Sequence, residues 1–110
     1  MDRGDIYFVT LDPTQGHEQQ GHQPVFIVSP AAFNQVTQTP IVLPITNGGG
    51  FTHARGFAVA LPVGKLQITG VIRCDQSRAI DINARRGRYV ERVPANVTAD
   101  VLAKLATIVQ

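Results

Sequence analysis

The sequence predicts a mainly β fold with minor α content: a small, strongly bent antiparallel barrel closed by a C-terminal helix. Two observations support this prediction. Seven short runs of β-branched and aromatic residues are separated by turns that contain glycine or proline. After Pro94 the hydrophobic pattern changes to a helical period. The chain of 110 residues has no internal repeat or linker, so we expect a single domain, 1–110, with its own core.

The first three strands are expected at 6–11, 25–28 and 41–45. The first is rich in β-branched and aromatic residues and ends at the turn signal Asp12-Pro13. The second is entirely apolar, which is typical of a central strand. Pro30 begins one or two helical turns over 30–34, because proline is tolerated at the start of a helix.

Four further strands are expected at 56–61, 69–75, 77–82 and 89–93. The C-terminal helix carries a hydrophobic stripe made of Val97, Val101, Leu105 and Ile108, with Leu102 and Val109 beside it. Such a stripe must pack on the barrel or on a partner, and packing on the barrel is the default expectation.

Composition excludes several classes of protein. Hydrophobic residues make up 44% of the chain and charged residues 16%, as in folded soluble domains rather than disordered chains. No apolar run is long enough to cross a bilayer, and the N-terminus does not resemble a signal peptide. The single cysteine cannot form an internal disulfide. We therefore expect a cytoplasmic protein that has no membrane partner.

The polar loop 14–23 is long enough to suggest a functional loop. Its histidines, His17 and His22, are five residues apart and would not share a helix face, so we expect no metal site. His17 is a candidate acid–base or phosphate-binding group, although a solvated loop histidine is the simpler interpretation. The glycine-rich stretch 46–50 lacks the lysine and hydroxyl of a P-loop, which indicates a hairpin connection.

Arginine is concentrated in one part of the chain. The net charge is only +2, yet six of the ten basic residues lie between positions 73 and 92, and all six are arginines: Arg73, Arg78, Arg85, Arg86, Arg88 and Arg92. Guanidinium groups suit planar contacts with phosphates. The cluster therefore indicates either a solvated basic face or a surface that follows a phosphate backbone.

The segment 70–76 combines apolar packing with charge. In a strand, Val71, Arg73 and Asp75 share one face, and the apolar residues between them point the other way. An unpaired charge is costly at a buried face, so Arg73 and Asp75 are expected to be solvated or paired. The spacing alone fits both a surface ion pair and a functional pair.

Motifs along the whole chain carry a family resemblance. They are Arg3-Gly4-Asp5-Ile6-Tyr7, Gly16-His17-Glu18-Gln19-Gln20-Gly21, Val28-Ser29-Pro30 and Gly70-Val71-Ile72-Arg73-Cys74-Asp75-Gln76. Together they resemble the Kid/PemK branch of the MazF family, the toxins of type II toxin–antitoxin modules. The resemblance implies an SH3-like barrel, a homodimer and a cytoplasmic endoribonuclease that needs no metal or other cofactor. It further implies cleavage of single-stranded mRNA at UA-containing triplets, which would inhibit translation and growth.

The resemblance also implies how the reaction proceeds. Asp75 resembles the general base that takes the 2′-hydroxyl proton, and the expected products are a 2′,3′-cyclic phosphate and a 5′-hydroxyl. Arg73 resembles the acid or electrostatic partner at the scissile phosphate. Because an arginine of ordinary pKa is a poor proton donor, the electrostatic role is the first expectation. His17 resembles a third participant that positions the phosphate.

Further positions resemble substrate contacts of the family: Thr46, Phe57, Thr69 and Val71, together with Glu18 and Gln19 of the histidine loop. The Phe57 ring would offer a face on which a base can stack. Three substrate-binding positions depart from the usual pattern: Gln23 stands where arginine is usual, Asn47 where a small hydroxyl residue is common, and Arg55 where a small residue is common.

The implied partner is a cognate antitoxin with a DNA-binding dimer head and a disordered acidic tail that blocks the RNA groove. Operator DNA would be contacted only through that antitoxin. Two alternatives remain open at this point. Because Gln23 removes an expected charge, the chain could be a weakened member that binds RNA and antitoxin without efficient cleavage. A similar barrel also occurs in gyrase poisons of the CcdB type, which act by protein contact.

Overall fold

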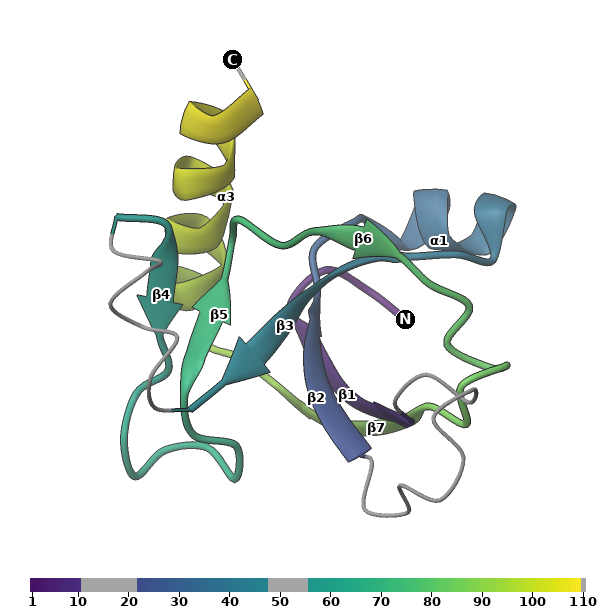
Figure 1. The fold of residues 1–110 in the computed structure, drawn as a ribbon, viewed down its shortest axis with the longest axis horizontal. Helices are drawn as coiled ribbons and strands as arrows, with labels where there is room; N and C mark the ends of the chain where they lie inside the picture. Colours follow the sequence, from purple (N-terminus) through teal and green to yellow (C-terminus); the bar gives the residue numbers. More distant parts are fainter. Residues whose placement is uncertain (11–21, 48–55, 110) are drawn as a thin grey trace.

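The computed structural model describes residues 1–10, 22–47 and 56–109, and these form seven strands and two helices. The elements in chain order are β1 (Asp5–Thr10), β2 (His22–Ile27), α1 (Ala31–Thr37), β3 (Ile41–Thr46), β4 (Ala58–Ala60), β5 (Val71–Arg73), β6 (Arg78–Ala79), β7 (Arg88–Arg92) and α3 (Ala95–Val109). All strand pairs are antiparallel, in the order β4-β5-β3-β2-β1-β7, with β6 also paired to β3. The predicted mainly β class, the antiparallel pairing and the seven strands are confirmed (Figure 1).

Apolar side chains cover both faces of the sheet. This explains why the last three residues of β2 are all apolar and do not alternate with polar ones. Phe26 belongs to the larger core, whereas its neighbours Val25 and Ile27 belong to a second cluster. Successive strand residues point to opposite faces, so β2 contributes to both layers. The second cluster consists of Val9, Val25, Ile27, Val42, Ile80 and Ile82.

The C-terminal helix packs on the larger core through its first half. Val97 and Val101 are buried there, and Leu105 is partly buried against the same core. Figure 1 shows α3 beside β4 and β5, with its last turn extending past them. Accordingly, Ile108 is 40% and Val109 77% exposed, so the predicted stripe packs on the core only as far as Leu105. Neither described helix is long and apolar enough to span a membrane.

The Arg3-Gly4-Asp5 motif has a structural role at the start of β1. The Arg3 Nε atom donates a 2.7 Å hydrogen bond to the Val28 carbonyl. The Asp5 carboxylate accepts a 2.8 Å hydrogen bond from Arg92, which lies opposite it on β7. Gly4 adopts a φ of +100°, which favours glycine. This motif therefore joins β1 to both its neighbours, and Arg92 is a structural arginine.

Several element boundaries differ from the sequence predictions. Residues His22 and Gln23 were expected in a loop but belong to β2, where they pair with β1. The fourth and fifth strands are shorter than the predicted 56–61 and 69–75. They begin only after Gly56 and Gly70, whose φ values of +87° and +126° are not those of a strand, and the fifth strand ends at Arg73 because the chain turns there.

Two other elements also differ in length. The sixth strand is reduced from 77–82 to two residues, because only those two pair with β3. The first helix is longer than the predicted 30–34, extending to Thr37 and ending at Gln38 in a left-handed conformation. It buries only Asn34 completely, so no hydrophobic stripe in the sequence marks its length.

We predict that Gly70→Ala destabilises the fold more than Gly64→Ala does. Both glycines have positive φ, but a Cβ at Gly70 would lie 2.5 Å from the Thr46 carbonyl oxygen, whereas a Cβ at Gly64 would have no atom of the described residues within 4 Å. The strained φ costs each variant about 1 kcal/mol. The overlap adds about 1–3 kcal/mol at Gly70. Urea denaturation measures the difference, and equal losses would contradict this explanation.

Candidate active site

The short strand β5 lies between β3 and β4, and this position determines where its charged side chains lie. Val71 pairs with Thr46 of β3, and Arg73 pairs with Ala58 of β4. Ile72 is completely buried in the larger core, which confirms the predicted alternation. The burial of Ile72 thus holds β5 in place. Arg73, the last residue of the strand, lies on the opposite face.

Arg73 and Asp75 form a bidentate ion pair. The Arg73 Nε atom donates to one carboxylate oxygen of Asp75 at 2.9 Å, and the terminal nitrogen donates to the other at 2.8 Å. The Arg73 side chain is 11% exposed and that of Asp75 33% exposed. Two parallel charge-assisted bonds fix both orientation and distance, which a single contact does not. The pair therefore joins a largely buried cation to an accessible carboxylate.

The ion pair also sets the protonation state of the site. The hydrogen bonds from Arg73 lower the pKa of the Asp75 carboxyl below its ordinary 3.8. The same contact raises the pKa of the Arg73 guanidinium above its already high ordinary value, in the direction that makes proton donation harder. At neutral pH the site consequently holds a carboxylate that can accept a proton and a permanent positive charge.

Cys74 lies between these two residues in the sequence but on the opposite side of the strand. It is 1% exposed within the larger core. Burial raises the pKa of its thiol to about 11, so the thiol stays protonated at neutral pH. The thiol is therefore part of the core packing and not a nucleophile.

The structure brings several predicted substrate-binding residues to β5. Thr46 lies directly opposite Val71, and its hydroxyl is buried without a hydrogen-bond partner among the described residues. The Phe57 carbonyl accepts a 2.8 Å hydrogen bond from the Cys74 amide. Phe57 as a whole is 41% exposed. Asn47 is exposed at the end of β3. These residues therefore surround the same strand.

Thr69 is exposed in the loop that leads into β5, and a carboxylate of β7 fixes this loop. Glu91 accepts hydrogen bonds from the Gln67 amide at 3.0 Å and the Ile68 amide at 2.9 Å. No sequence pattern indicates this role of Glu91, because the two segments are far apart in the chain. His17, Glu18, Gln19 and Arg55 lie outside the described residues.

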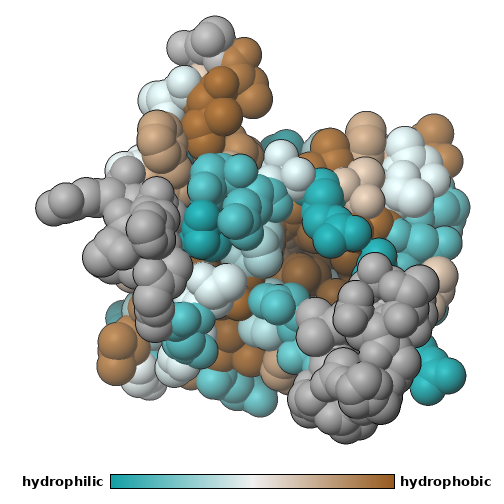
Figure 2. Space-filling model, in the orientation of Figure 1, coloured by the Kyte–Doolittle hydropathy of each residue, from teal (hydrophilic) through white to brown (hydrophobic). Residues whose placement is uncertain are grey.

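Gln23 is half-buried on β2 and lines an open pocket of about 240 Å³. Gln76, Arg78 and Arg85 lie at the rim of this pocket, and its apolar floor is formed by Pro44 and four members of the second cluster: Val9, Val25, Val42 and Ile80. Figure 2 shows the corresponding hydrophobic hollow with hydrophilic side chains around it. Gln76 directly follows Asp75, so the pocket adjoins the ion pair.

The pocket residues Arg78 and Arg85 were noticed in the sequence only as members of the arginine cluster. Nothing in the sequence distinguished them from Arg92, which is bound to Asp5, or from Arg88, whose guanidinium lies 5.2 Å from the centre of the Phe8 ring. Only the fold separates these structural arginines from the two at the pocket. In the described ranges, no cluster of three histidine, cysteine or carboxylate residues could hold a metal ion.

Comparison with known proteins identifies the family. The family of PemK-like, MazF-like toxins of type II toxin–antitoxin systems matches residues 2–109. The chain belongs to this family. Endoribonuclease PemK of Escherichia coli is 56% identical over 108 residues, which cover 98% of this chain and 81% of that protein. Endoribonuclease toxin ChpB of Escherichia coli strain K12 is 38% identical over 111 residues, which cover 100% and 95%.

A solved structure of the family has the same fold. The structure of MazE–MazF from Deinococcus radiodurans (Form-III) contains a chain that matches with a TM-score of 0.82 at 32% identity, over 98% of this chain and 94% of that one. The family predicted from the sequence motifs is therefore confirmed, and its members are PemK/MazF-type toxins.

We predict that replacing Arg73 by glutamine raises the pKa of Asp75 towards its ordinary 3.8. Since the pKa of Asp75 is lower in the folded chain, the pair stabilises the fold at pH values above 3.8, and this contribution is lost as the pH falls through the folded pKa. Carboxyl ¹³C chemical shifts followed from pH 7 to pH 2 measure the change. The same Asp75 titration in both proteins would contradict the assignment.

Proposed function

We propose that this endoribonuclease toxin cleaves single-stranded RNA at UA-containing triplets without a metal ion, and leaves a 2′,3′-cyclic phosphate and a 5′-hydroxyl. The bidentate Arg73–Asp75 pair is the observation that carries the proposal. RNA contains its own nucleophile, so the enzyme needs only a base near the 2′-hydroxyl and positive charge near the phosphate. The pair supplies both at the end of one strand.

In this reaction the Asp75 carboxylate takes the proton of the 2′-hydroxyl as the 2′-oxygen attacks the adjacent phosphorus. The bond from phosphorus to the 5′-oxygen then breaks, and that oxygen takes a proton from water. Arg73 stabilises the negative charge that develops on the phosphoryl oxygens, because its raised pKa makes it a cation rather than an acid. His17 would position the phosphate, as its family resemblance implies.

The residues around β5 fit a single-stranded substrate. The exposed Phe57 would stack on a base, which single-stranded RNA favours. The Thr46 hydroxyl, which has no hydrogen-bond partner among the described residues, would bond to the RNA, because buried polar groups usually have a partner. Further contacts are proposed for the substrate-binding positions expected from the resemblance: Glu18, Gln19, Gln23, Asn47, Arg55, Thr69 and Val71.

The proposed partners follow from the family. A cognate antitoxin would bind the toxin and block its RNA groove, and the MazF chain matched above comes from a MazE–MazF structure. We further propose a cytoplasmic homodimer whose activity inhibits translation and growth. A weakened nuclease is the second candidate function, favoured by the neutral amide of Gln23 where the family usually has arginine.

Incubation of the protein with mixed-sequence single-stranded RNA in EDTA tests this function. We expect discrete cuts at UA-containing triplets, with 2′,3′-cyclic phosphates detected by mass spectrometry. Cleavage only after Mg²⁺ is added would contradict the mechanism. RNA that is bound but not cut would favour the second candidate, and Gln23→Arg should then restore cleavage.

We predict that Asp75→Asn lowers the single-turnover cleavage rate by about 10²–10⁴-fold, because the amide cannot accept the 2′-hydroxyl proton. Asp100→Asn is the matched control, since Asp100 is an exposed carboxylate on α3 whose one ion pair within the described ranges is with Lys104. Its rate should stay within about twofold of the wild type, as expected for a surface change. Equal rates for Asp75→Asn and the wild type would exclude Asp75 as the base.

A further inference from the structure

The side-chain amide of Gln23 is held in one orientation by the backbone. Its Nε2 atom donates to the carbonyl of Ile45 at 2.9 Å and to the carbonyl of Pro24 at 3.2 Å. An amide nitrogen has two hydrogens, so these bonds match its donors. The reversed amide would place its oxygen against two carbonyl oxygens, which excludes that orientation.

This anchoring leaves the amide oxygen as the end that can bind a ligand. Over the described part of the chain, Gln23 Oε1 accepts no hydrogen bond, and the residue lines the pocket described above. An amide that is free to rotate can serve as donor or acceptor, whereas one whose nitrogen is already bonded offers an acceptor alone. The arginine that is usual at this position has only donors.

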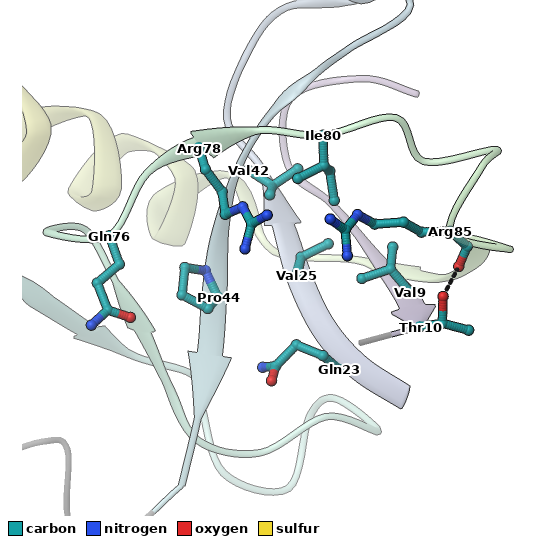
Figure 3. Close-up of a pocket in the computed structure, with 10 residues that line it drawn as sticks. All are labelled: Val9, Thr10, Gln23, Val25, Val42, Pro44, Gln76, Arg78, Ile80 and Arg85. Carbon is teal, nitrogen blue, oxygen red and sulfur yellow. Dashed lines mark hydrogen bonds between the residues drawn. The ribbon is translucent and has the colours of Figure 1, made fainter. Parts of the chain in front are cut away.

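The rest of the pocket is suited to one nucleotide. Its floor is apolar and includes Val25 and Val42, which is compatible with the face of a base. Figure 3 shows the guanidinium groups of Arg78 and Arg85 pointing towards each other from opposite sides of the pocket, with Gln23 below them. Among the described carboxylates none forms an ion pair with either guanidinium.

The orientation of Arg85 is supported by its backbone. The Arg85 carbonyl accepts hydrogen bonds from the Thr10 amide at 2.8 Å and from the Thr10 hydroxyl at 2.9 Å, which fasten this segment to β1. Two like charges that face each other favour an anion between them, and guanidinium groups match a phosphate. The pocket thus combines a phosphate-binding rim, an apolar floor and one fixed acceptor.

We propose that Gln23 is a specificity-determining residue: its Oε1 atom accepts a hydrogen bond from the exocyclic amino group of adenine or cytosine in a nucleotide held by Arg78 and Arg85. Uracil lacks such an amino group, so the pocket discriminates against it at this position. The inference rests on the proposed RNA substrate. It assigns recognition of one base of that RNA to the Gln23 pocket, and this role is separate from the chemistry at Asp75.

Binding of uncleavable RNA analogues tests the inference. The probes are 2′-fluoro oligonucleotides, which lack the attacking hydroxyl, of a sequence that contains a UA step. In a matched series, each adenine in turn is replaced by unsubstituted purine and each cytosine by its analogue without the 4-amino group. Fluorescence anisotropy then gives the Kd of every probe for the wild type and its variants.

At one position of the series, loss of the amino group should weaken binding to the wild type by about five- to tenfold, the effect of one hydrogen bond. Gln23→Met and Gln23→Arg should bind the probe with this amino group and the probe without it equally, since neither side chain offers the amide acceptor. Gln76→Met is the matched control: it makes the same chemical change in the same pocket, at an amide with no anchoring bond in the described structure. This variant should keep the difference.

The inference is overturned if the wild type binds every probe alike, or if the difference survives in Gln23→Met. These outcomes are separate from those of the cleavage assay. RNA cleavage without discrimination by amino group leaves the proposed function intact and removes only the inference. Discrimination in binding without cleavage supports the inference and removes the nuclease mechanism.

Discussion

The bidentate contact between Arg73 and Asp75 depends on the packing of a three-residue strand. Ile72 is buried in the core, and β5 is paired on both sides, so the position of the Arg73 backbone does not depend on the contacts of its side chain. A cation that is 11% exposed would be costly to bury alone, and Asp75 compensates for that cost. The same contact keeps the carboxylate ionised, so the stability of this part of the fold and the proposed chemistry depend on one pair of side chains.

The fold could be predicted largely from local patterns. β-Branched runs separated by turns indicated all seven strands, and the helical period after Pro94 indicated α3, because these signals are short in range. The strand ends could not be predicted, since the left-handed conformations of Gly56 and Gly70 are invisible in composition. Nor could the sequence show that α3 leaves Val109 exposed, because that depends on where the sheet ends.

The geometry of the candidate site could be predicted only where it depends on residues close together in the sequence. The alternation of the predicted strand 69–75 placed Arg73 and Asp75 on one face. In the structure β5 ends at Arg73, Asp75 lies in the turn that follows, and the two side chains are paired. Pairing partners distant in sequence left no signal: the carboxylate of Glu91 fastens the loop before β5, and the carbonyl of Ile45 orients Gln23. The departure from arginine at Gln23 was visible in the sequence, but its anchoring was not.

In the proposed mechanism, Asp75 removes the proton while Arg73 acts by charge. Cleavage of RNA with a sulfur atom at the scissile 5′-position tests it most directly, because a thiolate leaves without a proton donor. If Arg73 acts by charge, Arg73→Gln should be about 10²–10³-fold slower than the wild type on both the oxygen and the sulfur substrates. Recovery of the wild-type rate by Arg73→Gln on the sulfur substrate would show that Arg73 is the acid, and would contradict the account.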